Sequence, residues 1–160
     1  MAYRIGLGTD FHQLAEGRKL WLGGVEIPHL KGALGHSDAD VLLHAICDAL
    51  LGALSLGDIG MHFPDSDDSF KDIDSKILLE KTFRLVRNKG FQVVNLDSVV
   101  CLEKPKIMTY AVAMRTLIAG ILDIHIDDIS IKATTTEKLG FVGREEGVVA
   151  QAIVLLKKVE

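Results

Sequence analysis

The segment 38–54 constrains the fold more than any other part of this sequence. Ser37 stands three residues before Asp40 at its head, a capping-box-like pattern that predicts the start of a helix. Most positions that follow are apolar, but Asp40, His44 and Asp48 recur every fourth residue and share one face. A solvated polar face is the alternative, yet the neighbouring positions are too apolar for a freely exposed helix. We therefore expect a buried helix whose polar stripe lines a cleft.

The remaining pattern predicts strands and two further helices around this helix. Alternation near the N-terminus predicts a glycine-rich strand that ends near Asp10, with Gly6, Gly8 and Asp10 on one face. Further strands are expected at 20–27, 91–102, 129–134 and 148–156, and further helices at 75–89 and 105–122. The order β-β-α-α-β-α-β-β predicts an α+β two-layer sandwich, with a mixed four- to five-stranded sheet and helices on one face.

Length and composition favour one domain over residues 1–160. A chain of 160 residues that is 48% hydrophobic can bury one substantial core. The net charge is −4 and the basic residues are scattered, so we expect no nucleic-acid partner. The N-terminus has no signal-peptide or transit-peptide pattern, and no apolar stretch approaches the roughly 20 residues of a membrane span. A cytosolic or already processed protein is expected.

The segment 60–74 is rich in aspartate and has little periodicity. Loops this long in compact domains are usually functional or mobile, so we interpret it as a lid.

Asp10, His12 and His44 are candidate metal ligands. Asp10 and His12 are two residues apart, so on a continuous strand they point the same way, although such a pair also caps turns. With His44 they form a set of two histidines and one carboxylate, which suits a tetrahedral zinc ion that keeps its fourth position for substrate. Iron or manganese also fits this set, so the residues leave the metal open.

Three other segments are candidates for phosphate binding. Gly35, His36 and Ser37 precede the buried helix, where backbone N–H groups favour an anion. Capping by Ser37 is expected whatever the function and is compatible with phosphate binding, so this pattern alone is not diagnostic. The segment 132–138 ends a predicted strand in threonines, Glu137 and two lysines, a mixture suited to a diphosphate and a hard divalent ion. Lys104 and Lys106, on either side of Pro105, place two cations at a strand-to-helix junction, where nucleotide contacts and helix capping are the two alternatives.

Several motifs at matching order and spacing resemble the methylerythritol cyclodiphosphate synthase family. They are G-L-G-T-D-F-H, G-H-S-D-A-D-V-L-L-H-A, L-G-D-I-G-M-H-F-P-D, K-P-K and K-A-T-T-T-E-K-L-G-F-V-G-R-E-E-G, and the likeness runs from Arg4 to about Lys157. The resemblance implies a homotrimer with active sites between subunits. It also implies a cytoplasmic bacterial protein or a processed protein of the plastid stroma.

The resemblance implies a role for each matching residue. Zinc would be bound by Asp10, His12 and His44, and a second ion, magnesium or manganese, by Glu137. His36 and Ser37 would contact substrate phosphate, and Asp58, Ile59, Gly60 and Asp65 the methylerythritol part. Leu102, Lys106, Ile107 and Met108, with Ala133, Thr134 and Thr135 of the adjoining subunit, would surround the cytidine and its phosphates. His36, Thr135 and Glu137 are the residues expected to be catalytic.

A few positions depart from the family pattern. Val142 and Glu145 interrupt the usual F-T-G-R-G-E-G, close to Phe141 and Arg144. In relatives this region lines the trimer axis and can hold isoprenoid diphosphates, so Phe141 and Arg144 are counted as candidate substrate-binding residues. Glu145 weighs against that ligand here.

The implied reaction is a cyclisation by a metal-dependent phosphorus–oxygen lyase. In 4-diphosphocytidyl-2-C-methyl-D-erythritol 2-phosphate, the 2-phosphate would attack the β-phosphorus and expel CMP, as a step of the methylerythritol phosphate route to isoprenoid precursors. A zinc-dependent phosphohydrolase and a non-catalytic, metal-stabilised trimeric scaffold are the alternatives. The first lacks a convincing general base beyond the ligands, and the second leaves the Thr-Thr-Thr-Glu segment unexplained.

Overall fold

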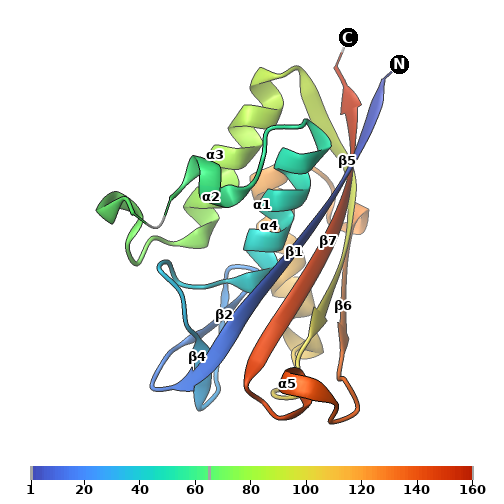
Figure 1. Ribbon diagram of the computed structural model, residues 1–160. Helices are drawn as coiled ribbons and strands as arrows, with labels where there is room; N and C mark the ends of the chain where they lie inside the picture. Colours follow the sequence, from blue (N-terminus) through green and yellow to red (C-terminus); the bar gives the residue numbers. More distant parts are fainter. Residues whose placement is uncertain (1, 65, 160) are drawn as a thin grey trace.

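A five-stranded mixed sheet forms one layer of the computed structural model, which describes residues 2–64 and 66–159 (Figure 1). Its order is β4-β1-β7-β5-β6, with β5 and β6 parallel and the other neighbours antiparallel. The strands are β1 Tyr3–Glu16, β4 Lys31–Ala33, β5 Phe91–Cys101, β6 Ile129–Thr134 and β7 Gly147–Lys158. The helices α1 Val41–Ala53, α3 Ser75–Asn88 and α4 Ala111–Leu122 cover one face. The predicted α+β two-layer sandwich is therefore confirmed.

Shorter elements connect these layers. A separate hairpin consists of β2 Leu20–Leu22 and β3 Val25–Ile27, and the short helices are α2 Ile59–His62 and α5 Gly140–Gly143. Single 3-10 turns lie at Asp68–Phe70, Met108–Tyr110 and Ile126–Asp128. In the part of the chain that the structure describes, no helix combines the length and the apolar character needed to cross a membrane.

Besides the start of the buried helix, three predicted boundaries were wrong. The strand expected at 20–27 is the β2–β3 hairpin, because Gly23 and Gly24 take positive φ angles of 58° and 78° and turn the chain. The first strand continues six residues past Asp10, since β7 pairs with it as far as Gln13 and β4 pairs with it from Leu14 onward. The third helix begins at 111 rather than 105, after an irregular segment in which Ile107 is buried in the core.

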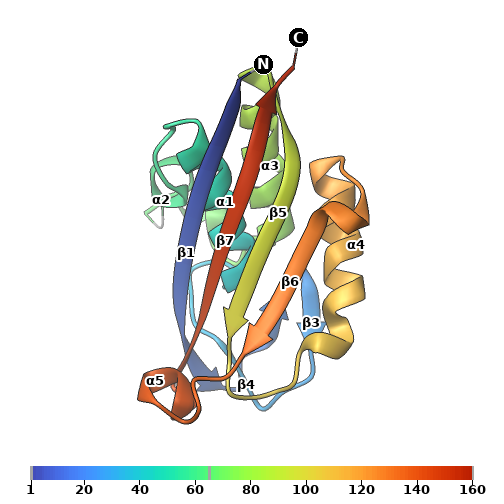
Figure 2. The same ribbon diagram turned by 90° about the vertical axis from the view of Figure 1, so that its right-hand side faces the viewer.

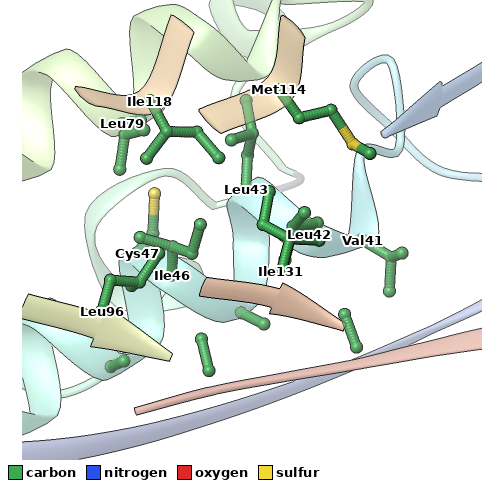
Figure 3. Packing of buried hydrophobic residues seen from close by; sticks show 14 of the residues in the cluster. Val41, Leu42, Leu43, Ile46, Cys47, Leu79, Leu96, Met114, Ile118 and Ile131 are labelled. Atoms are coloured by element: carbon green, nitrogen blue, oxygen red, sulfur yellow. The ribbon is translucent and has the colours of Figure 1, made fainter. Parts of the chain in front are cut away.

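The buried helix α1 lies at the centre of the core. Figure 3 shows Leu42, Leu43 and Ile46 between side chains of the helical layer, such as Leu79, and side chains of the sheet, such as Leu96. All of these side chains are at most 1% exposed. The prediction that this helix is buried is confirmed, although it begins at Val41 rather than 38.

Two glycines of β1 allow the sheet to approach α1 closely. A Cβ atom on Gly6 would lie 2.8 Å from the backbone nitrogen of Ala53, and one on Gly8 would lie 2.7 Å from that of Ala49. Real Cβ atoms do not come this close to backbone atoms, so any larger residue would push the two elements apart. The glycines thereby set the distance between the strand that carries Asp10 and the helix that carries His44.

The other face of the sheet carries large apolar side chains on β1 and β7, and no helix lies over it within the described chain (Figure 2). Ile5, Leu7 and Phe11 alternate along β1 and are 71%, 63% and 59% exposed. Ile153 lies beside Leu7 on β7 and is 45% exposed. Four large apolar side chains on one uncovered surface are typical of a face that another subunit covers.

The two ends of the chain lie side by side. Tyr3 of β1 is paired with Lys157 of β7, and Figures 1 and 2 show both termini leaving the same end of the sheet. The helix α5 lies at the opposite end.

Candidate active site

The structure brings Asp10, His12 and His44 together, as the sequence predicted. His12 Nε2 lies 2.9 Å from Asp10 Oδ2, His44 Nδ1 lies 3.1 Å from the same oxygen, and the two nitrogens are 3.2 Å apart. Asp10 and His12 project from the same side of β1, and His44 comes from the second turn of α1. One oxygen and two imidazole nitrogens therefore converge on a single point.

The hydrogen bonds of the cluster are compatible with a metal site. His12 Nδ1 donates a hydrogen bond of 2.7 Å to the carbonyl oxygen of Leu34, so in the neutral ring Nε2 carries the lone pair. If His44 also turns a lone pair toward Asp10, the two rings and the carboxylate repel one another unless a proton or a metal ion lies between them. Two histidines and one carboxylate are a donor set that binds zinc with one position left for substrate. The residues therefore fit a divalent metal ion.

The ionisation of the cluster also favours a cation. Without a metal ion, the ring nitrogens that face Asp10 can instead carry hydrogens: burial alone would raise the pKa of Asp10, but hydrogen bonds from His12 and His44 then outweigh it and hold that pKa well below its ordinary value. Burial alone would lower the pKa of His12, but the hydrogen bond and charge of Asp10 outweigh it and raise that pKa. Asp10 thus stays charged, and positive charge is stabilised beside it.

The cluster opens into a cavity of about 340 Å³. His36, Ser37, Ile59 and Gly60, all predicted substrate contacts, line this cavity together with the three candidate ligands. The segment 60–74 forms much of its wall, through residues that the sequence did not single out: Phe63, Pro64, Phe70 and Ile73. A lid fits this location, but its movement remains a prediction. Asp65 lies outside the described residues.

The polar stripe of α1 does not line this cavity as predicted. Asp40 is fully buried and caps the helix, accepting hydrogen bonds from the backbone nitrogens of Gly23, Gly24 and Leu43. Asp48 accepts a hydrogen bond of 2.7 Å from Ile59 N and so holds the start of α2. Among the three stripe residues only His44 reaches the cavity, because the other two carboxylates bind backbone donors.

The predicted role of Ser37 as helix cap was also wrong. Asp40 takes that position, three residues later, so His36 and Ser37 lie in the preceding loop rather than at the first turn of the helix. The interpretation of an anion site made by that first turn fails, because the Asp40 carboxylate occupies it. His36 and Ser37 still face the cavity beside the metal ligands.

A second cavity, of about 220 Å³, lies at the carboxyl ends of β5 and β6. It collects all seven residues predicted to surround the cytidine, together with Pro105: Leu102, Lys106, Ile107, Met108, Ala133, Thr134 and Thr135. Ala133, Thr134 and Thr135, which the resemblance assigned to an adjoining subunit, thus line the same cavity of one chain as the other four. No residue that lines it also lines the first cavity. Within one chain the metal cluster and this second cavity are therefore separate.

The other predicted residues lie outside both cavities. Asp58 caps α2, and Glu137 is exposed in a turn where Thr135 Oγ1 donates to its carboxylate at 3.2 Å. Arg144 forms two hydrogen bonds, of 3.0 and 2.9 Å, with Glu146. Phe141 packs near Phe11, with ring centroids 6.4 Å apart. Their proposed binding roles stay predictions.

Comparison with known proteins assigns the chain to a family. Residues 3–157 match the model of the YgbB family. A relative from Bacteroides fragilis is 58% identical over 99% of this chain and 100% of its own length, and one from Chlorobium phaeobacteroides is 62% identical over 97% and 98%. Both are named 2-C-methyl-D-erythritol 2,4-cyclodiphosphate synthase.

Solved structures agree with this assignment. A 2C-methyl-D-erythritol-2,4-cyclodiphosphate synthase described as its CDP-bound form has a TM-score of 0.89 and 39% identity, covering 96% of this chain and 100% of that one. The bifunctional IspDF of Campylobacter jejuni has a TM-score of 0.95 and 44% identity, covering 99% of this chain, which spans only 43% of the IspDF chain. The family resemblance seen in the motifs is thus confirmed: this chain belongs to the YgbB family, among relatives named 2-C-methyl-D-erythritol 2,4-cyclodiphosphate synthase.

Proposed function

We propose that this protein converts 4-diphosphocytidyl-2-C-methyl-D-erythritol 2-phosphate to 2-C-methyl-D-erythritol 2,4-cyclodiphosphate and releases CMP. The observation that carries the proposal is the cluster of Asp10, His12 and His44, which opens into a cavity also lined by His36 and Ser37. The names of the relatives support the same reaction.

The chain's own residues bind and orient the substrate in this mechanism. Asp10, His12 and His44 would hold zinc, which supplies positive charge to the phosphates when bound. Ser37 accepts a hydrogen bond from Ala39 N at 3.1 Å, and its own hydroxyl hydrogen is available to phosphate. An oxygen of the 2-phosphate attacks the β-phosphorus, the bond from that phosphorus to the CMP oxygen breaks, and CMP leaves with the electron pair. Holding the two ends of one substrate together supplies much of the rate.

We further propose a homotrimer whose active sites lie between subunits. The separation of the two cavities supports it, since a substrate with cytidine at one end and methylerythritol at the other needs both. The exposed apolar residues Ile5, Leu7 and Phe11 give the sheet a surface to pack against other subunits. Light scattering should give three times the chain mass of 17.5 kDa. A fully active monomer would contradict the shared site.

A second ion completes the proposal. The exposed carboxylate of Glu137, beside the cavity that Thr135 lines, would hold magnesium or manganese on the diphosphate.

The bacterial relatives support a cytoplasmic location over the plastid stroma.

Phosphorus NMR of the reaction with the cytidyl substrate tests the function. We expect CMP and the two coupled resonances of a cyclic diphosphate, with zinc present in the protein after dialysis. Inorganic phosphate or a linear product would instead indicate the phosphohydrolase. An unchanged substrate, with zinc bound and magnesium or manganese supplied, would favour the non-catalytic scaffold and refute the proposal.

A further inference from the structure

Ser75 lies directly behind the metal cluster, on the side of His44 that faces away from Asp10. It is the first residue of α3 and is fully buried. Its Oγ is 2.9 Å from His44 Nε2, while the other ring nitrogen, Nδ1, faces Asp10 and His12. Ser75 thus contacts a candidate ligand without lining the cavity itself.

The hydrogen bonds around Ser75 fix which atom carries each proton. Ser75 Oγ donates to Asp38 Oδ1, and Ser75 N donates to Asp38 Oδ2 at 3.0 Å. An ionised carboxylate only accepts, so the Ser75 hydroxyl hydrogen points at Asp38 and the oxygen offers lone pairs to His44. His44 Nε2 must therefore be the donor. Ser37 Oγ, 3.2 Å from the same nitrogen, is a second acceptor.

We propose that Ser75, oriented by Asp38, is a positioning residue that holds His44 in the tautomer able to bind the metal. With the hydrogen on Nε2, the lone pair on Nδ1 faces Asp10 and His12. This inference rests on the metal site of the proposed function. It deepens that proposal by naming the residue that fixes the tautomer of His44, the third ligand. His12 has the corresponding acceptor in the Leu34 carbonyl, so each histidine is fixed from behind.

The same residues join the metal site to the end of segment 60–74. Ser75 follows that segment directly, Asp38 N donates to Ile73 O at 3.1 Å, and Asp72 N donates to His36 O at 2.7 Å. The acceptor for His44 is therefore held at the point where this cavity wall meets the loop of His36 and Ser37. Order at the end of the segment supports the correct orientation of His44.

The test compares Ser75→Ala with Ser98→Ala. Ser98 is a buried serine, 3% exposed, that donates one hydrogen bond of 2.9 Å to Ser130 O in the sheet. Its replacement by alanine therefore removes the same hydroxyl group as Ser75→Ala, but at a position outside the metal cluster. Zinc affinity of the metal-free proteins is measured by competition with a chromophoric chelator. We expect Ser75→Ala to bind zinc about 10-fold or more weakly, the usual size of such effects, and Ser98→Ala to stay within about 2-fold of the parent.

Long-range ¹H–¹⁵N NMR of the histidine rings provides a readout that a merely structural role would not move. In the neutral ring of the metal-free parent, His44 should carry its hydrogen on Nε2. Ser75→Ala should give a mixture of both tautomers. If Ser75→Ala does not fold, Asp38→Asn provides the same test, because a freed Ser75 hydroxyl can then donate to His44 Nε2 and permit the other tautomer.

The possible outcomes distinguish a failure of this inference from a failure of the proposed function. A parent protein that binds no zinc would refute the metal site, whatever Ser75 does. A parent that binds zinc, with unchanged affinity and an unchanged His44 tautomer in Ser75→Ala or Asp38→Asn, would overturn the positioning role alone.

Discussion

Replacing Gly8 by alanine tests whether the closeness of β1 and α1 determines both stability and the metal site. The new Cβ atom would lie 2.7 Å from Ala49 N and nearer still to Ala45 O. Non-bonded heavy atoms need ~3.5 Å, so the strand and the helix would have to separate by roughly 1.5 Å to relieve the contact with Ala45 O. Both obstructing atoms belong to the backbone and cannot rotate away. The helix has little room to move, since Leu42 and Leu50 are fully buried on its sides.

The expected cost follows from this geometry. Overpacking against backbone costs ~3 kcal/mol, the upper end of the usual range. Reduced freedom of the unfolded chain returns ~0.4–1 kcal/mol. The net loss of about 2–3 kcal/mol lowers the melting temperature by about 5–10 °C for a chain of this length. Zinc content should fall as well, because Gly8 is two residues from Asp10, Ala45 is next to His44, and metal sites tolerate only about 0.2 Å of error.

Thermal melts of the metal-free protein and zinc analysis after dialysis measure the two effects. The matched control is Gly120→Ala in α4, where a Cβ would meet no atom within 4 Å. That change should raise stability by up to ~1 kcal/mol, since alanine favours a helix over glycine. If Gly8→Ala melts within about 2 °C of the parent and retains its zinc, the glycines do not set the distance between β1 and α1.

Three other predictions concern single side chains. His44→Ala should lose zinc on dialysis, because two remaining protein ligands are too few, and unchanged zinc by metal analysis would contradict the ligand assignment. Glu137→Gln should keep zinc and the melting temperature but release CMP about 100-fold more slowly, with partial recovery in excess magnesium. A near-parental rate without added divalent ion would leave Glu137 as a turn residue only. Burial raises the pKa of the Cys47 thiol to about 12, so Ellman's reagent at about pH 8 should modify Cys47 only after unfolding. Rapid labelling of Cys47 in the native protein would show that α1 opens readily.

Local pattern predicted the elements of the fold well, and it predicted the metal cluster. Asp10 and His12 share a side of β1 because alternation along a strand is a local property. The hairpin at 20–27 was missed although its signal, two consecutive glycines between short apolar runs, was present. Attention to Gly23 and Gly24 would have divided that strand.

Tertiary contacts determine the features of the site that the local sequence pattern does not predict. Asp40 belongs to the polar stripe by spacing, but its partners Gly23 and Gly24 come from a hairpin 16–17 residues earlier in the chain. Ser75 contacts His44, 31 residues before it, and no spacing rule relates a helix start to a histidine on another helix. The two cavities likewise depend on how segments pack, which the sequence pattern does not specify.

The paired ends of the chain make this domain suitable for joining to other polypeptides. Phe91, at the start of β5, is paired with Lys158 beside the C-terminus, whereas Cys101, which precedes the second cavity, lies at the far end of that strand. Asp10 and His12 are likewise well along β1 from the N-terminus. An affinity tag or a second enzyme attached at either terminus would therefore extend away from both cavities. The bifunctional chain of Campylobacter jejuni, in which a region like this one makes up 43% of the length, has the arrangement that such termini permit.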